Sequence, residues 1–155
     1  MTNQTLANFI AMFFASSGSN SGLLIDYNVV DGAYVYGQGA AISGIPQDPG
    51  DAGTISNITI DHNTVRGGSA IIAATDYYPE GVATSPDETQ TYNIQITNNT
   101  LEGQTGGNAT IDVSGGDTGS VNGAVVSGNV FSPGPSNSIT QDDHSYNVSV
   151  GNNSL

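Results

Sequence analysis

The sequence predicts an all-β solenoid of five stacked units, and three observations support this fold class. The segment 56–67 recurs in recognisable copies along the chain. In each copy two apolar residues alternate with polar ones, as Ile58 and Ile60 do, which is the period of a strand with one buried face. An Asn follows three residues after the second apolar residue, and there it predicts a corner between two strands.

The corner Asn residues define the phase of the repeat. The copies cover 21–32, 56–67, 92–103, 122–131 and 146–155, and their corner residues are Asn28, Asn63, Asn99, Asn129 and Asn153. The corners are 35, 36, 30 and 24 residues apart, so the repeat has a constant core and variable loops, which is typical of a solenoid. Because Asn tolerates the left-handed backbone conformation, we expect the corner Asn itself to adopt it.

A further apolar segment after each corner is expected to supply the returning strand. The candidates are 33–36 or 40–43 in the first unit, then 69–74, 109–113 and 138–140. Segments rich in Pro, Gly and Asp, such as 44–53, separate them from the next copy and predict loops.

Residues 1–20 lie before the first copy and predict a separate element, an amphipathic helix preceding the β-solenoid domain of residues 21–155. Leu6, Phe9, Ile10, Phe13 and Phe14 follow the helical spacing i, i+3, i+4, i+7 and i+8. A signal peptide would need a basic leading segment, and residues 1–20 contain no Lys or Arg. The apolar run is also too short to span a bilayer. We therefore expect a cap over the open end of the solenoid, with a partner-binding arm as the alternative.

These copies and corner Asn residues resemble the repeat of the right-handed parallel β-helix proteins, the pectate-lyase-like superfamily, in which corner Asn residues stack in ladders. The resemblance covers residues 22–155. It implies a short right-handed parallel β-helix of about five coils. It does not select one function, because the superfamily includes polysaccharide lyases and hydrolases, phage tailspikes and purely structural virion proteins.

The charge balance excludes two classes of partner. The chain has one Arg, no Lys and 14 acidic residues, giving a net charge of −13. No basic patch can be built for nucleic-acid phosphates or for an anionic membrane surface. The absence of Cys excludes disulfides and thiolate metal sites. This polar surface, poor in basic residues, favours a virion surface or an extracellular setting.

One pair of carboxylates is a candidate cation site. Counting from the corner Asn puts Asp26 and Asp61 in one outward column, on strands about 4.8 Å apart. Two adjacent carboxylates repel each other, so they should share a proton or a cation, for which Ca²⁺ is the natural candidate. Two solvated aspartates are the alternative.

The resemblance also bears on catalysis. Lyases of the superfamily commonly bind calcium through outward acidic residues, and they need a basic residue to abstract a proton. Arg66 is the only Lys or Arg and lies three residues past its corner, beyond the strand with the acidic pair. We assign no catalytic residue and no cofactor other than the candidate Ca²⁺. The segment 141–144, Gln-Asp-Asp-His, resembles the paired-aspartate motif of polygalacturonases, but their companion motifs are missing, which indicates a polar turn.

Two further regions are candidates for binding. Asp76, Tyr77, Tyr78 and Glu80 form an acidic aromatic loop that is suited to a glycan or to a neighbouring protein, a solvated loop being the alternative. At the other end of the chain Val148, Val150 and Leu155 are expected to leave a strand edge unpaired, which predicts self-association.

Taken with the resemblance to compact β-helices that trimerise on phage particles, these features predict a non-enzymatic structural surface protein. We expect a capsid decoration (cement) protein or a spike component that assembles as a homotrimer on a capsid or other virion protein. A polysaccharide lyase or hydrolase and a carbohydrate-binding module are the alternatives.

Overall fold

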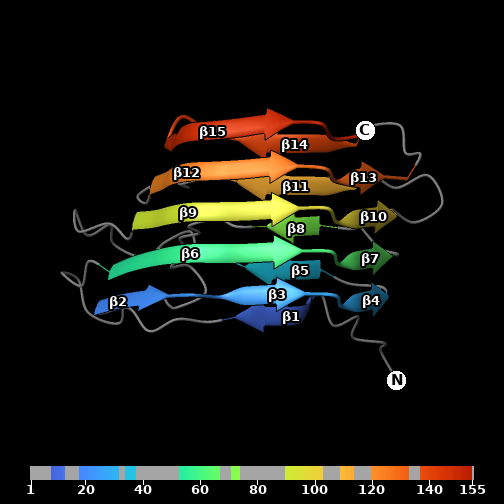
Figure 1. The fold of residues 1–155 in the computed structure, drawn as a ribbon, viewed down its shortest axis with the longest axis horizontal. Coiled ribbons are helices and arrows are strands. Elements are labelled where there is room, and N and C mark those ends of the chain that lie inside the picture. The colour runs from blue at the N-terminus through green and yellow to red at the C-terminus, as the bar shows by residue number, and fades with distance from the viewer. Residues whose placement is uncertain are drawn as a thin grey trace, which may run out of the picture.

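Parallel strands in three sheets make up the fold. The computed structural model describes residues 8–12, 18–31, 34–37, 53–66, 71–73, 90–102, 109–113, 120–132 and 137–154. Within these ranges the chain is all-β and contains no helix, so none that could cross a membrane. Every strand pairing in the three sheets is parallel (Figure 1).

The chain visits the three sheets in a fixed order. Sheet A contains β1 (Asn8–Met12), β5 (Tyr34–Gly37), β8 (Ile71–Ala73), β11 (Thr110–Val113) and β14 (Ser138–Gln141). Sheet B contains β2 (Gly18–Ser21), β3 (Leu24–Asp26), β6 (Gly53–Asp61), β9 (Gln90–Thr97), β12 (Ser120–Ser127) and β15 (Ser145–Gly151). Sheet C contains β4 (Val29–Asp31), β7 (Thr64–Arg66), β10 (Thr100–Glu102) and β13 (Val130–Phe131).

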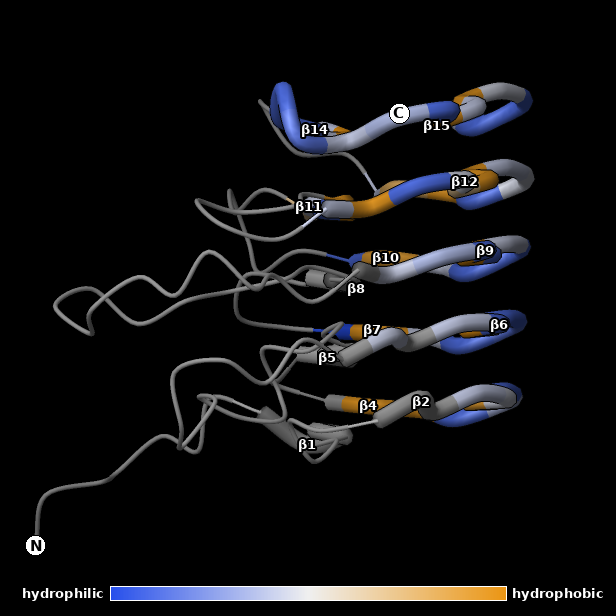
Figure 2. The backbone as a smooth tube through the Cα atoms, turned by 90° about the vertical axis from the view of Figure 1, so that its left-hand side faces the viewer, coloured by the Kyte–Doolittle hydropathy of each residue, from blue (hydrophilic) through white to orange (hydrophobic). Residues whose placement is uncertain are grey.

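One passage through sheets A, B and C is called a coil here, and five coils are stacked. The first contains β1, β2, β3 and β4, and the last contains β14 and β15, with Ser154 bridging to Val130 of sheet C. Figure 2 shows the coils as successive layers, with hydrophobic and hydrophilic segments recurring at corresponding places. This arrangement is compatible with the expected parallel β-helix.

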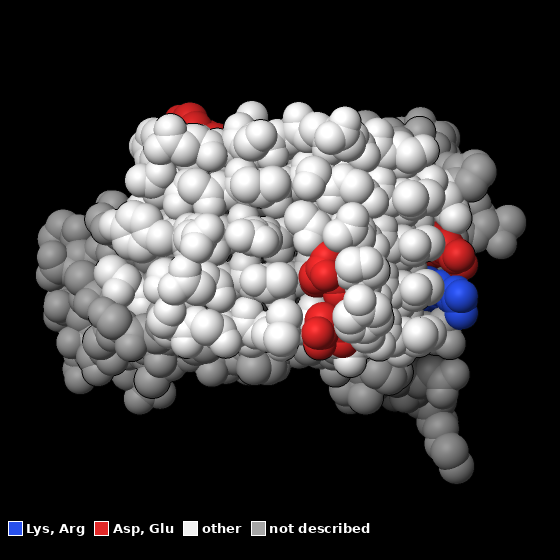
Figure 3. Space-filling view, viewed as in Figure 1, with Lys and Arg blue, Asp and Glu red and all other residues white. Residues whose placement is uncertain are grey.

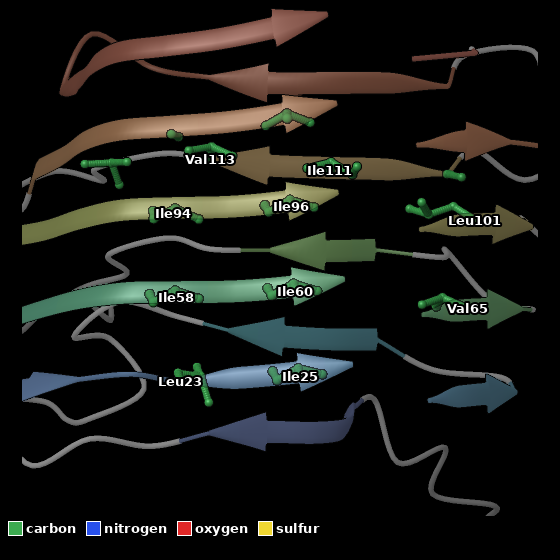
Figure 4. Close-up of a cluster of buried hydrophobic side chains, with 14 of the residues drawn as sticks. Leu23, Ile25, Ile58, Ile60, Val65, Ile94, Ile96, Leu101, Ile111 and Val113 are labelled. Atoms are coloured by element: carbon green, nitrogen blue, oxygen red, sulfur yellow. The ribbon is translucent and has the colours of Figure 1, made fainter. Parts of the chain in front are cut away.

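The core consists of columns of apolar side chains that run along the stack. The strand register pairs Ile58 with Ile94 and Ile60 with Ile96, and all four side chains are fully buried. Figure 4 shows these two columns continuing to Leu23 and Ile25 of the first coil. Burying each such side chain stabilises the fold by about 1.5–3 kcal/mol relative to leaving it exposed. The predicted alternation of apolar and polar residues is therefore confirmed for these strands.

The returning strands lie in sheet A. β5 overlaps the first of the two candidates in the first unit, 33–36, while 40–43 lies outside the described residues. β8 and β11 fall inside the predicted segments 69–74 and 109–113, and β14 extends 138–140 by one residue.

The predicted N-terminal helix is wrong for residues 8–12. These residues form strand β1, which pairs with β5 and so adds a strand to sheet A. Residues 18–21 form β2, which pairs with β6 in sheet B. A short apolar segment fits a helical or a strand period almost equally well, and here pairing with a neighbouring strand decides. Residues 1–7 and 13–17 of the expected helix lie outside the described residues.

The expected left-handed corner Asn is also a correction. The positive φ angles occur one residue earlier, at Tyr27, His62, Asn98, Gly128 and Asn152. A second row of positive φ angles lies inside sheet B, at Gly22, Asn57, Asn93, Gly123 and Asn147. The residue before the corner Asn therefore makes the turn, and the Asn itself is needed for the hydrogen bonds of its side chain.

Candidate functional site

The five corner Asn side chains form a continuous hydrogen-bonded ladder. At the first step the backbone N–H and the Nδ2 of Asn28 both donate to Oδ1 of Asn63, each at 3.0 Å. The same pair of bonds joins Asn63 to Asn99, Asn99 to Asn129, and Asn129 to Asn153, at 2.9–3.0 Å. The ladder thus runs from the first coil to the fifth.

Asn99, at the centre of the ladder, shows why this residue type is needed. Its Oδ1 accepts two bonds from Asn63, and its Nδ2 donates to Oδ1 of Asn129 at 3.0 Å and to the carbonyl oxygen of Ile60 at 2.9 Å. Two acceptor sites and two donor hydrogens are the full capacity of an amide side chain. Asn99 is completely buried, so a residue without both functions would leave polar groups unpaired in the core.

The predicted acidic column lies on sheet B, beside this ladder. The strand register pairs Asp26 with Asp61 and Asp61 with Thr97, and Ser127 and Gly151 continue the column. Oδ1 of Asp61 accepts bonds from Oγ1 of Thr97 at 2.5 Å and from Nδ2 of Asn98 at 3.0 Å. Its Oδ2 lies 2.5 Å from Nδ1 of His62. Both carboxylate oxygens are therefore engaged within the chain.

These contacts set the protonation of Asp61. Burial by itself would raise the pKa of Asp61. The hydrogen bonds from Thr97, His62 and Asn98, together with the charge of His62 when protonated, outweigh burial and hold the pKa below its ordinary value of 3.8. Asp61 is therefore a stabilised carboxylate and not a proton donor at neutral pH.

Aromatic stacking completes this cluster. The rings of Tyr27 and His62 are stacked, with centroids 4.9 Å apart and planes 10° from parallel. Both residues have a positive φ and immediately precede a corner Asn, in successive coils. Counting from the corner Asn places Thr97 after Asp61 in the same column, and the strand register confirms it, but Tyr27, His62 and Asn98 were not identified as neighbours of Asp61 from the sequence. Counting back from each corner Asn, as was done for the aspartates, could have found them.

The calcium site stays a prediction. Within the part of the chain that the structure describes, no group of three or more His, Asp or Glu side chains is arranged to hold a metal ion. The repulsion that motivated a cation is reduced by Thr97, Asn98 and His62, which supply hydrogen bonds to Asp61.

The single Arg does not face the acidic column. Arg66 ends β7 in sheet C, and its Nε lies 3.1 Å from Oε2 of Glu102 in the next coil. In Figure 3 Arg66, the one blue side chain, lies next to acidic atoms at the right-hand end of the face. The other acidic atoms on this face lie away from it. Asp61 is in sheet B, on the other side of the corner.

The segment 141–144 forms the polar connection expected between two strands. Oδ1 of Asp142 accepts bonds from the backbone N–H of His144 at 3.1 Å and from Oγ of Ser145 at 2.7 Å. The Oγ of Ser145 also lies 2.9 Å from the carbonyl oxygen of Val113, to which it donates. Asp142 thus stabilises the turn from β14 into β15.

The two predicted binding regions differ in what the structure describes. Asp76, Tyr77, Tyr78 and Glu80 lie outside the described residues, as does Leu155. Val148 is half-buried against the core, and Val150 is 50% exposed.

Searches against protein-family models, curated proteins and solved structures found no match to this chain.

Proposed function

We propose that this chain is a non-enzymatic structural protein of a virion surface or an extracellular assembly, built as a short right-handed parallel β-helix of the pectate-lyase-like type. Its role is that of a phage capsid decoration (cement) protein or a spike component. It assembles as a homo-oligomer on a capsid or other virion protein.

The observation that carries this proposal is the Asn ladder. The ladder joins every coil to the next through two hydrogen bonds per step, over the whole described stack. Fully satisfied polar networks in a core make a structure rigid and specify one register. A rigid stack of coils, each held to its neighbours, suits a structural protein on a surface.

The polar groups of the acidic column support the same proposal. A lyase needs an unengaged base beside the carbon that loses its proton, together with a cation that neutralises the substrate carboxylate. The Asp61 carboxylate already accepts bonds from Thr97 and Asn98, and Arg66 is paired with Glu102 in a different sheet. These contacts favour a structural role for the two charged groups.

The test compares polyuronate cleavage by the parent protein, Asp61→Asn and the control Asp112→Asn. Asp112 is a matched control because it too accepts a bond from a Thr of the next coil, Oγ1 of Thr140 at 2.7 Å. We expect no unsaturated product from any of the three proteins, measured by ultraviolet absorbance with and without Ca²⁺. Cleavage by the parent and by Asp112→Asn, but not by Asp61→Asn, would refute the proposal in favour of a lyase.

A further inference from the structure

Strand β12 of sheet B contains a chemically reactive pair of residues. Asn122 and Gly123 form the only Asn-Gly pair in the chain. Because Gly has no side chain, the backbone nitrogen of Gly123 is not shielded from the side-chain amide of Asn122. Both residues are half-exposed, so water has access to them. A reaction between the backbone nitrogen and the amide is therefore sterically open at this pair.

The pairing of β12 with its neighbours is interrupted at Gly123. The strand register pairs Asn122 with Tyr92 on one side and with Tyr146 on the other, and it resumes at Ala124. Gly123 itself has no register partner in β9 or β15, and its φ is 81°, which Gly adopts without strain. Backbone outside the regular ladder moves more easily than paired backbone. The two reacting groups can therefore approach each other without separating a register pair.

A neighbouring amide is placed to promote this reaction. Nδ2 of Asn147, in the fifth coil, donates to Oδ1 of Asn122 at 2.7 Å. Attack on Cγ of Asn122 moves negative charge onto this oxygen. A donor that already points at the oxygen stabilises the charge as it develops.

Asn57, in the second coil, has the same kind of donor but no following Gly. Its Oδ1 accepts a bond from Nδ2 of Asn93, also at 2.7 Å, and its side chain is exposed. The next residue, Ile58, is fully buried and pairs in register with Ile94. The branched side chain of Ile58 shields its backbone nitrogen. Asn57 is therefore a matched internal control for the effect of Gly123.

We propose that Asn122 is a site of spontaneous deamidation in the folded protein, and that Asn147 promotes the reaction. The backbone nitrogen of Gly123 loses its proton to water or hydroxide and bonds to Cγ of Asn122. The bond from Cγ to Nδ2 breaks, and ammonia leaves. Water then opens the cyclic succinimide: hydrolysis at Cγ gives Asp, and hydrolysis at the backbone carbonyl carbon gives isoaspartate. Either product adds a negative charge to sheet B, and the inference does not depend on the proposed function.

The test follows the folded parent protein and two variants of Asn147 during incubation at neutral and mildly alkaline pH. Asn147→Gly removes the donor and keeps the positive φ, because Gly occupies the same row at Gly22 and Gly123. Asn147→Asp keeps the shape of the side chain and also removes the donor, and it serves if Asn147→Gly fails to fold by circular dichroism.

Mass spectrometry of peptides measures the conversion of Asn122 and Asn57 from the mass difference between Asn and Asp. We expect conversion at Asn122, faster at the higher pH, and none at Asn57. Because one hydrogen bond to the developing charge is lost, conversion of Asn122 should be slower by about two- to tenfold in the Asn147 variants.

A sample of the parent protein unfolded in urea gives the rate without the fold. Conversion of Asn122 in the unfolded chain alone, or equal conversion of Asn122 and Asn57 in the folded protein, would overturn the site. Conversion in the Asn147 variants that is as fast as in the parent protein, or faster, would overturn the role of Asn147.

Discussion

Replacing one corner Asn of the ladder should destabilise the protein, and the loss should depend on whether that Asn lies at the buried centre or at the first coil. In Asn99→Ala the backbone N–H of Asn63 loses the Oδ1 atom that accepts it at 2.9 Å in the core. An orphaned buried donor costs about 1–3 kcal/mol, and each of the other three lost bonds about 0.5–1.5 kcal/mol. We therefore expect the free energy of unfolding to fall by about 2.5–7.5 kcal/mol, against a total of about 5–15 kcal/mol for a domain.

The control for this prediction is the first rung. The Nδ2 of Asn28 donates to Asp26 and Asn63, but its Oδ1 accepts no bond from a described residue, and the side chain is only half-buried. Asn28→Ala loses these two bonds but orphans no buried donor, so it should cost about 1 kcal/mol, the low end for two partly exposed bonds of about 0.5–1.5 kcal/mol each. Urea unfolding followed by circular dichroism, at one fixed protein concentration, measures both variants. Equal losses for Asn28→Ala and Asn99→Ala would refute the assignment of the ladder as a core network.

Three further substitutions test other contacts. Oγ1 of Thr91 is buried without a hydrogen-bond partner among the described residues, so Thr91→Val should raise the free energy of unfolding by about 1 kcal/mol; a loss in urea titration would contradict this. Because the pKa of Asp61 is lower in the folded chain, its carboxylate contributes stability that is complete above about pH 5 and is lost as the pH falls through 3.8 and below. Asp61→Asn should remove that part of the pH dependence of stability, as measured by thermal unfolding between neutral and acidic pH. If Asp61→Asn shows the same pH dependence as the parent protein, the carboxylate of Asp61 is not its cause. Arg66→Gln should change the free energy of unfolding by less than about 0.5 kcal/mol, because the bond to Glu102 is half-exposed; a larger loss would show that the pair is more than a surface contact.

The sequence predicted the stacking of the coils because two local signals share one phase. Ile58 and Ile60 alternate with polar residues, and Asn63 follows at a fixed offset, so the register of neighbouring coils could be counted from the corner alone. The same counting identified the pairing of Asp26 with Asp61, which the strand register contains. Strong short-range patterns that repeat are sufficient to align strands far apart in the chain.

Other features depended on long-range contacts that no single segment encodes. Residues 8–12 have a spacing that also fits a helix, and pairing with β5 makes them a strand. The prediction that the corner Asn has a positive φ was wrong, because it rested on the conformational preference of Asn alone. The Asn occurs at the corner because its side chain makes buried hydrogen bonds, and the residue before it has the positive φ. Counting from the corner Asn places Thr97 beside Asp61, but the hydrogen bonds that Thr97, Asn98 and His62 make to Asp61 depend on side-chain positions, which only the stacked coils show.

The direction of the interstrand bonds has a mechanical consequence. In all three sheets the backbone hydrogen bonds run between coils, along the stacking axis, and the first and last described strands lie at opposite ends of it (Figure 1). A pulling force applied to these ends would load the coils in series, so that rungs separate one after another under modest tension. A force directed along the strands would instead shear many bonds at once. Such a stack should resist a force along its strands better than a force along its stacking axis.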